Sequence, residues 1–499
     1  MMDSIGYILQ GFAVCLQPIN LLYTFIGVLL GTIIGVLPGI GPAAGIALLI
    51  PITYGMNSTS AIILMAGLYY GARYGGSTTS ILIRTPGEAA SVMTSLDGYE
   101  MAKKGRAGAA LAIAAIGSFI AGTIGVVGMT LFSLPLTSFA LKFGPAEYFC
   151  LMVLAMTSVS SLTGSSPAKG LLSTVIGLML ATVGTDLQSG QSRFTLGIAE
   201  FSDGIGFVAV VVGMFAVAEV LRALESICRG DAPPPMRISG RLWLTREEWR
   251  RSIGPIWRGS IIGFIVGVLP GAGGAIASFF SYITEKKLSK HPEEFGHGAI
   301  EGVAGPESAN NSDTAGAMIP LLTLGIPGGG TTAVLSGVLI MHGIQPGPNL
   351  FEKHPDLVWG LIASMYVGNV MLLILNLPLV GVFVRMLYMP QGILFPLIIV
   401  ISAIGAFALN SSTTDLYLIL IFGVLGYLFE KVDIPIAPLV LSLVLGGMME
   451  QSFRQAMTVS GGNPLIFLHS NVARVLVVLS LMALAAPLIA RFFRKPAQA

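Results

Sequence analysis

Residues 31–41 read GTIIGVLPGIG, and residues 263–273 read GFIVGVLPGAG. A shorter echo follows each copy, because residues 84–88 read RTPGE and residues 325–329 read GIPGG. Two echoes in the same order and at nearly the same offset predict an internal duplication of the chain. The competing explanation is that a proline–glycine pair simply marks a helix break in any membrane protein.

The chain around these motifs is too apolar for a soluble protein. Only 10% of its 499 residues are charged and 54% are hydrophobic, against about 25% charged residues in soluble domains. The 63 glycines indicate close helix contacts or interrupted helices. Unbroken apolar runs such as residues 361–379 favour spanning helices over an outer-membrane barrel. We therefore expect an all-α polytopic protein in a lipid bilayer, with no nucleic-acid partner.

Each GVLPGxG motif is expected to form the tip of a re-entrant hairpin. In the second copy the apolar limb from Trp257 to Gly271 would rise only about 20 Å, which is short for a membrane crossing. Its flanks are basic, whereas the first copy has no lysine or arginine on either flank. This contrast predicts hairpins that enter from opposite faces, with Pro38 and Gly39 at one tip and Pro270 and Gly271 at the other.

Opposite-facing hairpins would make the two halves inverted-topology repeats with broken helices. We expect a first membrane repeat over residues 1–228, a basic cytoplasmic linker over 229–258 and a second membrane repeat over 259–499. The basic C-terminal tail favours a cytoplasmic end, which strict inversion does not give. Parallel repeats, or an extra element in the second half, therefore remain alternatives.

Several functional classes are excluded by what the sequence lacks. It contains no G-x-x-x-x-G-K-[ST] nucleotide-binding motif and no H-E-x-x-H metal motif. It offers no paired acids or nucleophile–base set for a membrane-embedded hydrolase, and a duplicated chain of this length is unlike one subunit of a ring-forming channel. We expect a transporter and not an enzyme, with no cofactor and no resident metal.

Hydroxyl-rich segments at two expected helix breaks are the candidate binding site: residues 73–80 leading into 81–87, and residues 310–314 followed by an apolar stretch and by 327–332. Broken helices direct free N–H groups into the gap between them, which favours an anion, and arginine matches the geometry of a carboxylate. The candidate substrate-binding residues are Pro38, Gly39, Arg73, Gly76, Ser77, Thr78, Thr79, Arg84, Pro270, Gly271, Gly329, Thr331 and Thr332.

Arg73 and Arg84 are the only two cations in the first hundred residues. An ionisable residue among apolar segments is a functional candidate, although either arginine could instead extend to the membrane interface. Asp313, with Asn310 and Asn311, is the candidate site for a coupling cation, Na⁺ or H⁺. The alternative role for Asp313 is the N-cap of a following helix.

Five motifs together resemble the large membrane subunit of the tripartite tricarboxylate transporters. They are GVLPGIG at 35–41, YYGARYGGSTTS at 69–80, IRTPGE at 83–88, DGY at 97–99 and PGGGTT at 327–332. The resemblance implies a secondary carrier of the bacterial inner membrane that imports citrate-like carboxylates on a cation gradient. It also implies two partners, a small membrane subunit and a periplasmic solute-binding protein. A stand-alone cation–carboxylate symporter is the nearest alternative.

Overall fold

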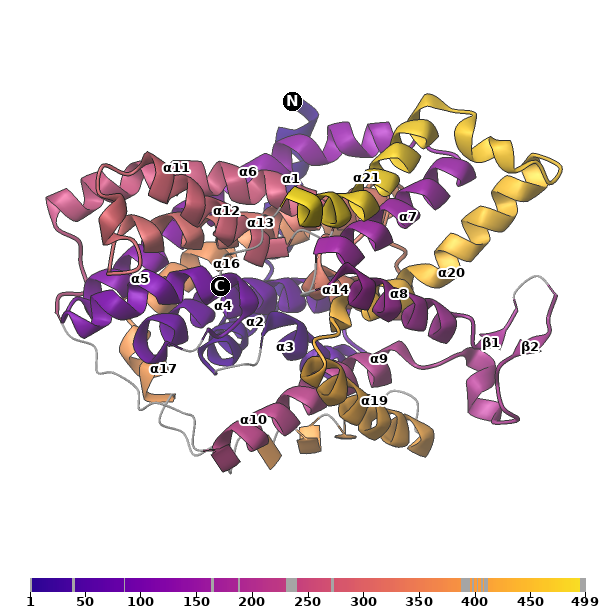
Figure 1. Ribbon diagram of the computed structural model, residues 1–499, viewed down its shortest axis with the longest axis horizontal. Helices are drawn as coiled ribbons and strands as arrows, with labels where there is room; N and C mark the ends of the chain where they lie inside the picture. Colours follow the sequence, from indigo (N-terminus) through magenta and orange to yellow (C-terminus); the bar gives the residue numbers. More distant parts are fainter. Residues whose placement is uncertain are drawn as a thin grey trace.

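The computed structural model is almost entirely helical (Figure 1). It describes residues 2–37, 41–84, 86–162, 166–186, 189–229, 240–270, 273–386, 395–396, 399–401, 403–404, 407 and 412–493. The elements up to the middle of the chain are α1 (Met2–Cys15), α2 (Pro18–Val36), α3 (Pro42–Leu49), η1 (Ile50–Thr53), α4 (Ser58–Ile83), η2 (Ala89–Ser91), α5 (Val92–Lys103), α6 (Ala107–Ala140), α7 (Pro145–Leu162), α8 (Pro167–Ala181), β1 (Gly184–Thr185), β2 (Ser192–Arg193), η3 (Ala199–Asp203), α9 (Phe207–Val211), η4 (Val212–Val217) and α10 (Ala218–Arg229).

The second part of the chain begins with the helix that carries the second GVLPGxG motif. Its elements are α11 (Arg246–Val268), α12 (Gly273–Leu288), η5 (Pro292–Glu294), α13 (Glu301–Leu324), α14 (Gly330–Met341), α15 (Leu350–Lys353), α16 (Pro355–Asn376), α17 (Val380–Met386), α19 (Thr413–Lys431), α20 (Ile436–Val459), η6 (Pro464–Leu468) and α21 (Asn471–Phe493). Among the described residues the only strands are β1 and β2, a short antiparallel pair that projects from the right edge in Figure 1.

Six helices within the described ranges are long and apolar enough to cross a membrane, which confirms an all-α, multi-pass membrane protein. Helices α7 and α21 pack as a pair beside the central helices, and α8 packs on α20, which is one of the six. The six candidate spans are Pro18–Val36, Ala107–Ala140, Phe207–Glu225, Pro355–Asn376, Thr413–Lys431 and Ile436–Val459.

Helices α2 and α4 pack through a stripe of glycines. A Cβ added at Gly27, Gly31 or Gly35 would come within 2.3–2.4 Å of a carbonyl oxygen of α4. Only glycine permits two backbones to approach this closely. The partners advance along α4 in the same direction as the glycines advance along α2, so the two helices run parallel: they are Leu64, Leu68 and Ala72.

Helices α11 and α13 pack in the same way. An added Cβ at Gly259, Gly263 or Gly267 would lie 2.2–2.6 Å from a carbonyl oxygen of α13. Gly263 and Gly267 occupy the motif positions that Gly31 and Gly35 occupy in the first copy. Helix α11 therefore runs parallel to α13, and the contacted residues are Gly305, Ala309 and Asp313.

Helices α4 and α13 lie at the centre of the fold and run in opposite directions. Arg73 contacts Asn310, and Ser77, one turn later in α4, contacts Glu307, nearly one turn earlier in α13. Nearly every residue of both helices is buried. Helix α2 runs parallel to α4, and α11 runs parallel to α13. Helices α2 and α11 therefore also run in opposite directions.

The expected helix breaks at residues 73–80 and 310–314 are wrong, since α4 and α13 are continuous through both segments. Gly75 serves a close helix contact, because its added Cβ would lie 2.4 Å from the Thr32 carbonyl oxygen. The hydroxyls of Thr79 and Ser80 donate to the Gly76 carbonyl within the helix. The chain leaves the helix only at the left-handed residues Arg84 (φ 57°) and Gly325 (φ 74°), each followed by proline two residues on.

The helix that carries the second GVLPGxG motif is longer than the limb that the sequence predicted. Helix α11 begins at Arg246, well before Trp257 and inside the stretch assigned to the linker. The reason is a capping box, in which the Glu248 amide donates to Thr245 Oγ1 (3.2 Å) and the Thr245 amide donates to Glu248 Oε2 (2.8 Å). Of the expected tip residues, Pro270 follows α11, and the three others, Pro38, Gly39 and Gly271, lie outside the described residues.

Candidate functional site

Arg73 is the centre of the candidate site. It lies in the middle of α4, is 5% exposed, and donates from Nη1 to Asn310 Oδ1 at 2.8 Å. Its ion pairs join Nη1 to Glu88 Oε2 at 3.1 Å and Nη2 to Asp313 Oδ2 at 3.4 Å. Its guanidinium also lies 5.2 Å from the ring centre of Tyr69. A buried guanidinium held by both central helices is a ready partner for a carboxylate.

The N-terminal ends of three helical elements, α12, α3 and η2, lie beside Arg73 or Glu88, and the N-terminal end of α14 reaches α12. An added Cβ at Gly274, in the first turn of α12, would lie 2.5 Å from Arg73 Nη1. Gly329, the N-cap of α14, approaches Gly273 of α12, and Gly41, the N-cap of α3, approaches the Glu88 side chain. Glu88 itself is the N-cap of η2, which leads into α5. Helix N-termini carry partial positive charge, so this arrangement favours an anion.

Most of the hydroxyl residues expected to bind substrate already form contacts within the protein. Ser77 Oγ donates to Glu307 Oε2 at 2.5 Å, and Thr332 Oγ1 accepts from the Gly329 amide at 2.9 Å. Thr78 lines a small space beside Asn376, large enough for about one water molecule. Thr331 is partly exposed at the start of α14. Of these residues, Thr331 and Thr332 lie at the N-terminal end of α14, which reaches α12.

The structure does not bring Arg84 to Arg73. Arg84 follows the last residue of α4, is exposed, and places its guanidinium 5.6 Å from the ring centre of Tyr99. Its left-handed backbone redirects the chain after the helix ends. This placement agrees with the alternative role of an arginine at the edge of the membrane.

The three candidate residues for cation coupling lie inside α13 and are all fully buried. Asp313 is therefore not a helix N-cap, and that alternative is wrong. Its Oδ2 atom pairs with Arg73, while its Oδ1 atom has no hydrogen-bond partner in the described part of the chain. Asn310 bridges Arg73 and Glu88, and Asn311 donates to Ser118 Oγ of α6 at 2.6 Å.

Two buried acids of this site were not among the candidates. Glu88 is the last residue of the RTPGE motif, and its negative charge was not considered as part of a binding site. Glu307 accepts hydrogen bonds from Ser77 of α4 and Thr94 of α5, and its side chain is fully buried. The signal was available, because an acid between two apolar stretches is by itself a functional candidate.

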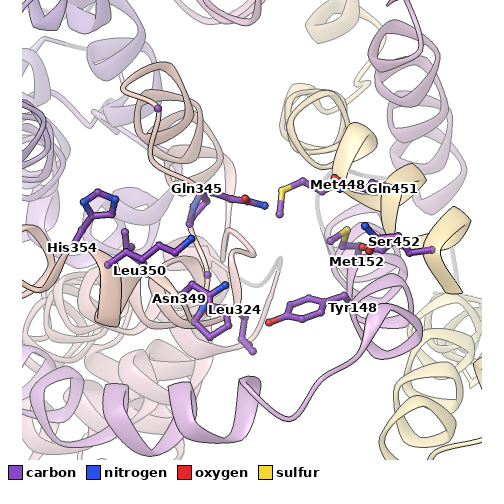
Figure 2. A pocket seen from close by; sticks show the side chains of 16 residues that line it. Tyr148, Met152, Leu324, Gln345, Asn349, Leu350, His354, Met448, Gln451 and Ser452 are labelled. Carbon is purple, nitrogen blue, oxygen red and sulfur yellow. The ribbon is translucent and has the colours of Figure 1, made fainter. Parts of the chain in front are cut away.

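A separate cleft of about 440 Å³ opens between the 343–354 segment and the helices α7 and α20 (Figure 2). Figure 2 shows Gln345 and Asn349 on one wall facing Tyr148 and Gln451 on the other. Among the described residues, the lining includes Lys353 and His354 and no acidic residue. Leu324, the last residue of α13, also lines the cleft.

The cleft adjoins the chain break that leads to α14. Gly325 follows Leu324, and a Cβ added to it would lie 2.7 Å from the Pro346 carbonyl oxygen. The segment from Gly325 to Gly329 therefore has the cleft at one end and the first turn of α12, beside Arg73, near the other.

Comparison with known proteins identifies the family. Residues 21–441 match the Tripartite tricarboxylate transporter TctA family. The chain is 50% identical over 481 residues to a protein of Agrobacterium vitis described as "Uncharacterized 52.8 kDa protein in TAR-I ttuC' 3'region", covering 96% of this chain and 95% of that protein.

A second relative from Agrobacterium vitis, "Uncharacterized protein in TAR-II ttuC' 3'region", is 49% identical over 220 residues. The alignment covers 44% of this chain and 91% of that protein. The matched family is one of transporters, which confirms the expectation that the chain is not an enzyme. With most of its length matched and its multi-pass helical fold, the chain belongs to the tripartite tricarboxylate transporter TctA family.

Proposed function

We propose that this chain is the membrane permease of a secondary importer for small carboxylates of the citrate class, driven by a cation gradient. The observation that carries the proposal is the buried guanidinium of Arg73, on which the N-terminal ends of α12 and η2 converge. The N-terminal end of α14 in turn contacts the start of α12. Substrate carboxylate would take the place that Glu88 and Asp313 hold beside Arg73. Gly76, Ser77 and Thr78 lie in the turn of α4 that follows Arg73.

We propose further that the two halves are inverted repeats with re-entrant hairpins. The opposite directions of α2 and α11 support this, because parallel repeats require the same direction. Each half also has the same local features: a glycine stripe and a left-handed residue at the helix end. In each half a hydroxyl also accepts a hydrogen bond from the amide three residues earlier, that of Glu88 or Gly329. In this arrangement α2–α3 and α11–α12 bring their tips to the site from opposite faces.

The basic residues favour a cytoplasmic position for the start of α13. Lys104 Nζ donates to the His297 carbonyl at 2.6 Å, and Arg106 pairs with Glu248 at 2.8 Å. These contacts, with Arg251 paired to Glu301, gather cations at the N-terminal end of α13. The cleft beside Leu324 would then face outward, where an acid-free lining suits the arrival of a carboxylate.

The expected partners follow from the tripartite family. We propose that a periplasmic solute-binding protein delivers substrate to the outward cleft, and that a small membrane subunit completes the carrier in the bacterial inner membrane. The unpartnered Asp313 Oδ1 supports a coupling role for Asp313, with Asn310 and Asn311 beside it in α13. The coupling ion is Na⁺ or H⁺.

Labelled citrate uptake into proteoliposomes tests this function. The full chain is reconstituted with and without the small subunit and the binding protein, and sodium and proton gradients are imposed separately. We expect uptake only with an inward cation gradient and with both partners present. Uptake without the binding protein would instead favour a stand-alone symporter. Failure to move citrate or other small carboxylates under any gradient would contradict carboxylate import.

A further inference from the structure

We propose that Glu307 is a proton-binding site of this carrier and that its proton enters together with the carboxylate. The inference deepens the proposed function and depends on it for the coupling, although not for the protonation itself. Glu307 lies in α13, three residues before Asn310, and reaches α4 at Ser77, four residues after Arg73. The site is therefore about one helical turn from the Arg73 site along both central helices.

The surroundings of Glu307 disfavour a permanent negative charge. The side chain is 0% exposed, and within the described part of the chain both carboxylate oxygens accept only from hydroxyl groups, those of Ser77 and Thr94. No lysine, arginine or histidine of the described chain forms an ion pair with it, whereas Glu88 and Asp313 share Arg73. An unpaired buried carboxylate is costly, so such a group takes up a proton or a cation.

The other charged groups that face α13 already have partners, whereas the Tyr70 hydroxyl of α4 has none among the described residues. Asp97 of α5 accepts from three backbone amides and from Tyr282, and Glu285 of α12 pairs with Arg258 at 2.5 Å. On α4, η2, α5, α11 and α12, the partnered groups are Tyr69, Arg73 and Tyr74 of α4, Glu88 before η2, Asp97 of α5, Arg251 and Arg258 of α11, and Tyr282 and Glu285 of α12.

The hydroxyl of Ser77 allows Glu307 to be satisfied in both protonation states. Its Oγ also lies 3.4 Å from the Arg73 carbonyl oxygen, which is a second acceptor. When Glu307 is protonated, its O–H donates to Ser77, and the Ser77 proton turns to that carbonyl. A sodium ion is less well served, because hard cations take about six oxygen ligands and only the two hydroxyls accompany the carboxylate here.

Protonation of Glu307 should favour the anionic substrate. Arg73 supplies one positive charge to three nearby carboxylates, those of Glu88, Asp313 and Glu307. An arriving carboxylate adds negative charge, so removing the charge of Glu307 lowers the electrostatic cost. Coupling is reciprocal, and therefore bound substrate must also favour the proton.

Infrared difference spectroscopy of the purified full chain tests the protonation without any substrate. We expect the wild type to show a protonated-carboxyl C=O band that disappears on raising the pH and is absent in Glu307→Gln. If the band is the same in both proteins, Glu307 is not the site. Should Glu307→Gln fail to fold, Thr94→Val removes one donor to the ionised form and should move the loss of the band to higher pH; an unchanged titration would contradict the proposal.

Citrate binding to the same proteins at constant sodium tests the coupling. Wild-type affinity should fall by up to about tenfold per pH unit where Glu307 loses its proton, and Glu307→Gln should bind citrate with little pH dependence. Glu219→Gln is the matched control, because Glu219 is a buried acid of α10 that pairs with Arg222; it should keep the wild-type pH profile. A pH-independent wild type would overturn the coupling. If citrate does not bind but the Glu307 band titrates, citrate import fails as the function and the proton site stands.

Discussion

The two central helices, α4 and α13, pack against their neighbours in the same way but carry buried charges of opposite sign. Helix α4 packs on the glycines of α2 as α13 packs on those of α11, and both end in a left-handed residue followed by a proline–glycine turn. Yet α4 contributes the buried cation Arg73, whereas α13 contributes the buried acids Glu307 and Asp313. Two helix pairs that pack alike can therefore hold an asymmetric site, since backbone packing depends on the glycines and charge depends on a few other positions.

Disrupting the glycine contacts of α2 with α4, or of α11 with α13, should have the largest effect. The loss of folded protein should be similar in both halves. Gly31→Val and Gly263→Val would each force a side chain into a carbonyl less than 2.5 Å from its Cβ. We expect loss of folded protein in both cases, measured as the monodisperse fraction after detergent extraction. The control is Gly447→Ala in α20, where nothing lies within 4 Å and alanine favours the helix. A well-folded Gly263→Val protein would show that the frame of the second half is not fixed by this packing.

The second prediction compares the two arginines of the first half. Arg73→Gln should weaken citrate binding by roughly 10- to 150-fold, the value of one charged hydrogen bond of about 1.5–3 kcal/mol. Lysine should restore little of this, because it lacks the fork of the guanidinium. Arg84→Gln should bind citrate as the wild type does, since Arg84 is exposed beside Tyr99. Equal losses in both variants, measured by calorimetry, would contradict the central role of Arg73.

The third prediction concerns the acid that faces Arg73. Asp313→Asn keeps the shape of the side chain and removes its charge. We expect folded protein whose citrate uptake depends much less on the driving cation, measured over a range of sodium concentrations and pH. Because Asp313 lies within α13, a capping defect cannot explain such a result. Uptake identical to the wild type at every condition would remove the coupling role.

The smallest effect is expected where the halves differ in their loops. The α12–α13 connection contains η5, whose Glu294 pairs with Arg251 at 2.5 Å, while the α3–α4 connection, which contains η1, has no charged residue. The Arg251 hydrogen bond lowers the pKa of Glu294 below its usual range. Its stabilising effect is therefore present above the ordinary glutamate pKa and is lost as the pH falls through the lowered value.

Glu294→Gln should accordingly reduce thermal stability slightly at neutral pH and leave it unchanged in strong acid. The effect should be small because the Glu294 side chain is 41% exposed and solvent screens such pairs. Thermal unfolding in detergent across this pH range measures it. A stability difference that grows as the pH falls would contradict the assigned sign.

The sequence by itself determined the class of this protein and its family. Few charges and long apolar runs require a bilayer, and the paired GVLPGxG motifs mark where the helices α2 and α11 end. It also identified Arg73 and Asp313, because a charge among apolar residues is costly unless it is used. These conclusions need only composition, spacing and the cost of burying charge.

The tertiary structure decided which of these residues meet. The sequence predicted breaks inside α4 and α13, but close packing keeps both helices continuous, because neighbouring helices outweigh weak local helix propensity. The helix end at Ile83 carries Arg84 away from the site, and the antiparallel contact of α4 with α13 brings Glu307 to Ser77 and Thr94. Residues more than two hundred positions apart form these pairs, and only the direction in which each helix packs determines that they touch.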